Sequence, residues 1–159
     1  MIRLKQSQNN KGFTIIETLL AIIILGIAVT MVTLSFSKIQ SHQALEKSSL
    51  LVLSVLGEAR SHTLSAVSDS RYGVNFQNDQ LVLFRGTSYA TTTSTNVFTT
   101  LNPLVGIRNI YLAGSSTSVV FERLTGKASV SGTLEVYLRS DPTLFKRITI
   151  TSIGLAEEN

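Results

Sequence analysis

The sequence predicts an α+β fold, in which a long N-terminal α-helix packs on a C-terminal antiparallel β-sheet or sandwich head. Two patterns carry this prediction. A continuous apolar run over residues 13–36 passes directly into an amphipathic helical pattern, and after residue 70 the hydrophobic period falls from about 3.6 to 2. The chain of 159 residues has room for one modest domain beside the helix. Because it contains no Cys, that domain must be held together by its apolar core.

The N-terminal segment, residues 1–12, is short, polar and basic. Three of the 14 Lys and Arg residues, Arg3, Lys5 and Lys11, lie before the apolar run, and the other basic residues nearly balance the 10 acidic ones. The net charge of +4 is therefore concentrated at the N-terminus and does not indicate a nucleic-acid-binding surface. A positive flank beside an apolar span stays cytoplasmic, so we expect the C-terminal part to face outward.

The apolar run 13–36 is long enough to cross a bilayer, because about 20 helical residues span a hydrocarbon core of about 30 Å. Its one charged residue is Glu17, and a carboxylate in such a run costs about 3 kcal/mol or more, so we expect it to have a partner. The run is longer than the apolar part of a secretory signal peptide, so any processing is expected before it, at Gly12, rather than after it. Gly26 lies in the helix interior, where a glycine costs roughly 1 kcal/mol, and it could equally be a close-packing site.

The helix is expected to continue to residue 66, because no Pro occurs before Pro103 and no Gly lies between Gly26 and Gly57. Apolar residues recur there at helical intervals, and Leu53 widens their stripe: Leu45, Val52, Leu56, Ala59 and Leu64. This stripe is the expected cover for the buried face of the sheet. The residues Ser68-Asp69-Ser70 mark the helix end.

The first strands are predicted at 72–76 and 81–84, joined by Asn78-Asp79 as a hairpin. Residues 87–100 are rich in Ser and Thr, which favours a solvated loop with an edge strand around residues 96–101; the alternative is a surface-modified or adhesive loop. Further strands are predicted at 107–112, 118–124, 128–130, 133–139 and 144–152, with Gly126, Gly132 and Asp141-Pro142 between them.

The strand 133–139 places Leu134, Val136 and Leu138 on one face, which fits an antiparallel sheet with one buried side. In the strand that follows, Phe145 is out of step with Ile148 and Ile150. We therefore expect a bulge or a late strand start near Phe145.

Candidate catalytic and metal-binding residues are few. Two helical pairs at i,i+4 spacing, His42 with Glu46 and Glu58 with His62, are interpreted as exposed pairs rather than metal ligands. No serine lies in a nucleophile elbow, and no glycine-rich phosphate loop occurs. We expect no enzyme activity, no cofactor and no metal.

The stretch Lys11-Gly12-Phe13-Thr14-Ile15-Ile16-Glu17, followed by an apolar helix, resembles the class III signal sequence of type IV pilins and related pseudopilins. The resemblance implies that a membrane prepilin peptidase cleaves between Gly12 and Phe13 and that the new Phe13 amine is methylated. It also implies that Glu17 meets a Phe13 amine, its own or a neighbour's, as a register key for assembly. Opposite charges about 4 Å apart attract by about 4 kcal/mol at an effective dielectric of 20, which matches the burial cost. The alternative is a generic single-pass anchor whose carboxylate snorkels to the interface.

A second resemblance covers the C-terminal part. Short segments near the helix end and in the strands are similar to those of GspH/FimT-type minor pilins: Glu58-Ala59-Arg60-Ser61, Val119-Val120-Phe121, Gly132-Thr133-Leu134-Glu135-Val136 and Arg147-Ile148-Thr149-Ile150 with Gly154. Together, the resemblances imply a leader at 1–12, a helix at 13–66 with a transmembrane or filament-core part at 13–36, and a β-rich head at 67–159. They leave open whether the machine is a pilus or a secretion pseudopilus.

The predicted function is a structural subunit, and a minor one, of a type IV pilus or a type II secretion pseudopilus. Its partners would be the membrane, the prepilin peptidase and other subunits. It would begin as a single-pass precursor in the cytoplasmic membrane with the head outside, and then enter a pilus or a periplasmic pseudopilus. The alternative is a DNA-binding minor pilin of a DNA-uptake system. Basic residues exceed acidic ones between Pro103 and Gly154, but Lys146 and Arg147 point to opposite faces of a strand, so scattered charge is favoured.

Overall fold

The computed structural model describes residues 12–159, apart from the side chains of residues 32–37. The chain divides into two units, Met1–Ile39 and Gln40–Asn159, and helix α1, Ile15–Leu64, contributes residues to both. The predicted leader at 1–12 lies outside the described residues except for Gly12, and the side chain of Phe36, at the end of the predicted apolar run, is not described either.

The first unit is described from Gly12 onward and is helical from Ile15. Its large apolar side chains, from Phe13 to Met31, are all at least half exposed. Over the described residues, no helix combines the length and the hydropathy needed to cross a membrane.

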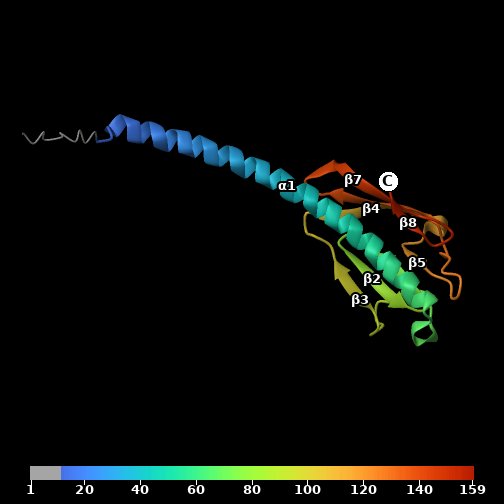
Figure 1. The fold of residues 1–159 in the computed structure, drawn as a ribbon. Helices are drawn as coiled ribbons and strands as arrows, with labels where there is room; N and C mark the ends of the chain where they lie inside the picture. Colours follow the sequence, from blue (N-terminus) through green and yellow to red (C-terminus); the bar gives the residue numbers. More distant parts are fainter. Residues whose placement is uncertain (1–11) are drawn as a thin grey trace, which may run out of the picture. The chain divides into compact units, whose positions relative to one another are not determined.

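The second unit contains the C-terminal part of α1 and two four-stranded antiparallel sheets (Figure 1). One sheet has the order β3-β2-β1-β5 and the other the order β4-β6-β7-β8. The strands of the first sheet are β1 (Tyr72–Phe76), β2 (Gln80–Arg85), β3 (Val97–Thr100) and β5 (Ser118–Val120). Those of the second are β4 (Val105–Leu112), β6 (Gly132–Leu138), β7 (Asp141–Ile150) and β8 (Ala156–Glu158). Two short 3₁₀ turns, Val67–Asp69 and Ala113–Ser115, complete the described elements. The α+β fold is thus confirmed.

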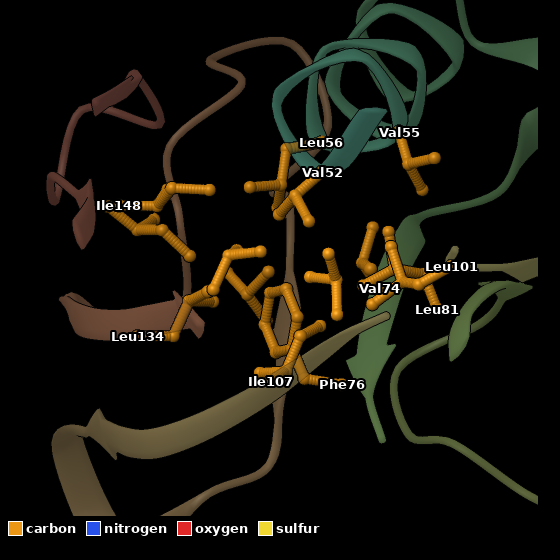
Figure 2. Packing of buried hydrophobic residues seen from close by; sticks show 14 of the residues in the cluster. Val52, Val55, Leu56, Val74, Phe76, Leu81, Leu101, Ile107, Leu134 and Ile148 are labelled. Carbon is orange, nitrogen blue, oxygen red and sulfur yellow. The ribbon is translucent and has the colours of Figure 1, made fainter. Parts of the chain in front are cut away.

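One face of α1 covers the core between the two sheets. Figure 2 shows Val52, Val55 and Leu56 of the helix pointing at side chains from both sheets. The sheets contribute Val74, Phe76 and Leu81 on one side and Ile107, Leu134 and Ile148 on the other. All of these side chains are at least 96% buried, so the apolar transfer term acts on nearly their whole surface.

The predicted helical stripe is confirmed at Leu45, Val52, Leu56 and Ala59, all buried. Leu64 is wrong, because it is 41% exposed in the last turn of the helix. The buried residue of this turn is instead Thr63, one position earlier. Its Oγ1 donates a hydrogen bond to the Ala59 carbonyl and accepts one from the Tyr72 N–H. The threonine hydroxyl gives the Tyr72 N–H, at the start of β1, a hydrogen-bond acceptor that an apolar side chain would not provide.

The hairpin and the edge strand are confirmed as β1, β2 and β3. The strand predicted at 128–130 is wrong, since only an isolated bridge joins Phe121 to Ala128. Strand β7 begins at Asp141, earlier than predicted, and its register against β6 shifts between Tyr137 and Leu138, as expected for a bulge. Leu134, Val136 and Leu138 are buried as predicted.

Candidate processing and assembly site

The start of α1 holds the residues predicted for processing and assembly. The N–H of Glu17 donates to Thr14 Oγ1 at 3.3 Å, and the Thr18 hydroxyl donates to the Thr14 carbonyl at 2.9 Å. Thr14 is therefore the N-cap of the helix, and Glu17 occupies the third helical position. An acidic side chain in the first turn is also favoured by the helix dipole.

Sequence reasoning missed the role of Thr14. The signal was available, because Thr14-Ile15-Ile16-Glu17 has the T-x-x-E spacing of a capping box before an apolar run. The cap fixes where the helix begins. As a result, Gly12 and Phe13 stay outside the helix, in a segment without regular secondary structure ahead of Ile15.

The neighbourhood of the predicted cleavage position is open. Phe13 is 84% exposed, and Glu17 is exposed as well. A Cβ added at Gly12 or at Gly26 would meet nothing within 4 Å. Within the described part of the chain, neither glycine is therefore required by a close contact.

Of the two predicted i,i+4 pairs, Glu58 with His62 is present, whereas Glu46 has a partner other than His42. Glu58 Oε1 lies 3.9 Å from His62 Nε2, and both side chains are substantially exposed. Glu46 instead pairs with Lys146 of β7 at 3.2 Å, not with His42. Among the described residues, no group of three or more His, Cys, Asp and Glu side chains is placed to hold a metal ion.

Four of the eight Lys and Arg residues of the head at 67–159 are engaged in ion pairs. Glu135 of β6 is buried and accepts hydrogen bonds from Arg147, Arg108 and Asn109, at 2.9, 3.2 and 2.7 Å. The bond from Arg147, with those from Asn109 and Arg108, lowers the pKa of Glu135 despite its burial. Guanidinium groups also stack here: Arg108 lies 4.7 Å from the ring centre of Tyr137.

Two further cations have acidic partners. Lys146 Nζ lies between Glu46 and Glu158, 3.2 and 2.5 Å away, and Arg123 pairs with Asp69. Lys146 faces the helix whereas Arg147 bonds to Glu135, so the two do point to opposite sides of β7 as predicted. These pairs neutralise charges that the DNA-binding alternative would need free.

A comparison with protein families matches residues 7–33 to the prokaryotic N-terminal methylation motif. Comparisons with curated proteins and with solved structures found no significant match. The matched residues contain Gly12, Phe13, Thr14 and Glu17, and the motif implies a membrane-anchored precursor, processing by a prepilin peptidase and assembly with other subunits. It indicates a structural subunit rather than an enzyme. Residues 7–33 therefore carry the class III signal peptide motif of type IV pilins, which supports a type IV pilin-like or pseudopilin subunit.

Proposed function

We propose that this chain is a minor structural subunit of a type IV pilus or a type II secretion pseudopilus, cleaved between Gly12 and Phe13 and methylated at the Phe13 amine. The observation that carries the proposal is the position of the methylation motif at the start of α1. The assignment as a minor subunit is supported by the resemblance of the head to GspH/FimT-type proteins.

The helix after the motif supports assembly through the N-terminal segment. Its apolar side chains are exposed on every side of the helix within their own unit, for example Ile22, Ile23, Ile24 and Leu25, at 59–64%. Such a surface needs either lipid or other apolar helices around it. A precursor in the cytoplasmic membrane with its head outside, later transferred to a filament core, satisfies both needs in turn.

Processing is tested by changing Gly12 to Val in the full chain, expressed with a prepilin peptidase. We expect mass spectrometry of the wild-type chain to give a species that begins at Phe13 and carries one methyl group, whereas the variant keeps residues 1–12. Because a Cβ at Gly12 meets nothing within 4 Å among the described residues, the loss of cleavage would reflect the peptidase and not misfolding. Gly26→Ala is the matched control and should be cleaved normally. Cleavage of the Gly12 variant would contradict the proposed site.

Assembly is tested at Glu17. The Glu17→Val variant should insert and be cleaved, yet fail to enter filaments, because the Phe13 amine of a neighbour would lack its counter-charge. Glu17→Asp, which keeps the charge on a shorter side chain, should retain part of the incorporation. Normal incorporation of the valine variant would remove Glu17 from the assembly mechanism while leaving the processing result intact.

A further inference from the structure

The two sheets have four outer strands, and three of these edges are blunted. In β4 the register shifts between Arg108 and Tyr111, and Asn109 has a φ of 49°, which together bend the edge. Strand β8 is three residues long and carries Glu157 and Glu158. Bulges, short strands and charges are the usual means by which proteins prevent an edge from pairing with another chain.

The edge of β5 is covered by another segment of the chain. The N–H of Ser129 donates to the Val120 carbonyl at 2.8 Å, and the Val120 N–H donates to Ser129 Oγ at 3.1 Å. The backbone on the outer side of β5 is therefore already hydrogen-bonded.

Strand β3 is also short, at four residues, but it has neither a bulge nor a charge. No Asp, Glu, Lys, Arg or His occurs between Arg85 and Arg108, and Pro103 lies beyond the end of the strand. Val97 and Phe98 are 55% and 54% exposed. In Figure 1, β3 lies at the margin of its sheet, with no labelled element beyond it.

The hydrogen-bond pattern shows which backbone groups of β3 face outward. The Leu101 N–H donates to the Asp79 carbonyl, so the alternation of an antiparallel ladder makes Val97 and Thr99 the other residues bonded to β2. The N–H and C=O groups of Phe98 and Thr100 therefore point away from the sheet. No hydrogen bond to these groups is found among the described residues.

We propose that β3 pairs antiparallel with β3 of a second copy of this chain, about a two-fold axis at Thr99. Phe98 of each copy then faces Thr100 of the other, and the four outward N–H groups and four outward C=O groups form four main-chain hydrogen bonds. The two Phe98 rings become diagonal neighbours, a separation that aromatic side chains can bridge.

A second copy suits this edge because the strand is self-complementary. The residues with outward-pointing backbone groups, Phe98 and Thr100, are two positions apart. A two-fold axis at Thr99 therefore places Phe98 of one copy opposite Thr100 of the other. An uncharged strand also gains nothing electrostatically from a charged partner, and a charge buried in the ladder would have no counter-ion there. The chain itself offers an uncharged extended strand of matching length.

The pair should be weak in dilute solution. A four-residue strand buries far less surface than the roughly 1,200 Å² of a stable interface. It becomes significant where subunits are concentrated, in a membrane or along neighbouring filaments. This inference goes beyond the proposed function and does not depend on cleavage at Gly12.

The absence of Cys from the chain allows a specific cross-linking test. In the proposed pair, the two Thr99 residues lie opposite each other as a non-hydrogen-bonded pair, with Cα atoms about 4.5 Å apart, a distance that a disulfide can span. The full-length Thr99→Cys chain, reconstituted in liposomes and treated with a mild oxidant, should form a covalent dimer on a non-reducing gel.

Val97→Cys is the matched control, because it lies in the same strand but would be separated from its copy by about 14 Å, four residues along the ladder. Thr91→Cys, in the preceding exposed loop, controls for random collisions. Both should give severalfold less dimer than Thr99→Cys. Adding Phe98→Lys to Thr99→Cys should remove most of the dimer, since it introduces a charge at the edge.

All variants are first compared by circular dichroism and thermal unfolding, and a Thr99→Cys chain that unfolds is replaced by a Phe98→Cys and Thr100→Cys mixture, which the pairing also brings together. Equal dimer yields at positions 97 and 99, or no dimer at 99, would overturn the proposal. A disulfide to a different subunit in cells, with no homodimer in liposomes, would also overturn it.

Discussion

At the scale of single residues, Glu135 shows what alternation along a strand predicts and what it misses. The period of β6 correctly places Glu135 opposite the core face of Leu134 and Val136. It does not predict that Glu135 is itself buried. Its cover comes from Arg108 of β4 and Arg147 of β7, and this cover depends on strand order, which no local pattern specifies.

We predict that Glu135→Gln destabilises the head by about 1–3 kcal/mol at neutral pH, because two guanidinium groups lose their shared carboxylate. The folded-state pKa of Glu135 is lowered, so its contribution is complete above the pKa of the unfolded chain and is lost as the pH falls through the folded pKa. Urea unfolding of the two proteins should therefore converge at acidic pH. Glu122→Gln is the control and should change little, because Glu122 is exposed and forms no ion pair among the described residues. A constant difference down to acidic pH would contradict the role of the charge.

The Thr63 hydroxyl links the helix to the first strand. It donates a hydrogen bond to the Ala59 carbonyl in α1 and accepts one from the N–H of Tyr72, the first residue of β1. Thr63→Val keeps the shape of the side chain and removes the acceptor, so the part-buried Tyr72 N–H loses its partner. We expect a loss of about 1–3 kcal/mol in the free energy of unfolding. Thr91→Val, in the exposed loop, should leave that free energy almost unchanged. An equal effect of the two substitutions would show that the hydrogen bond contributes little.

At the scale of elements, the turns that contain Gly126 and Gly154 pack against each other and against the C-terminal end of α1. The sequence marked Gly126 only as a separator between strands and placed Gly154 near the end of the head. Arg60 Nε donates to the Gly126 carbonyl at 3.2 Å, and a Cβ on Gly154 would lie 1.9 Å from that same oxygen. Gly154 also has a φ of +82°. The turn is thus packed against the helix through its backbone, which explains why a side chain does not fit.

We predict that Gly154→Ala destabilises the head by several kcal/mol, through backbone strain and through displacement of the Gly126 turn. Gly57→Ala is a control from the helix, because its added Cβ meets nothing within 4 Å. Replacing a glycine inside a helix should instead stabilise the protein by about 1 kcal/mol. Thermal unfolding of both variants measures the contrast. A tolerated alanine at 154 would mean that the two turns can separate without cost.

At the scale of the whole molecule, the sequence predicted the parts that follow from local periodicity. The helix, the strands of the β1–β2 hairpin and the buried face of β6 come from the spacing of apolar residues. The edge position of β3 comes from the Ser- and Thr-rich composition of residues 87–100. The misses have long-range causes. Leu64 satisfied the helical period, but in the last turn the buried position that meets β1 is taken by Thr63. Residues 128–130 satisfied a strand pattern, but instead of a strand they form an isolated bridge from Ala128 to Phe121 and the hydrogen bonds of Ser129 to Val120. The N-cap at Thr14 differs from these misses, because its T-x-x-E motif is local and the sequence alone was enough to predict it.

The two-unit division leads to a prediction for the isolated head. The buried core lies entirely between Ala44 and Ile150, so a fragment from Lys38 to Asn159 contains all of it. We expect this fragment to unfold cooperatively, with a midpoint within a few degrees of that of the head in the full chain. A fragment beginning at Glu58 lacks Leu45, Val52, Val55 and Leu56, which leaves both sheets uncovered on one face, and it should bind hydrophobic dyes and show no cooperative transition. Circular dichroism melting and dye binding make the comparison. If the longer fragment also fails to fold, the N-terminal helical segment contributes to the stability of the head, and the two units are energetically coupled.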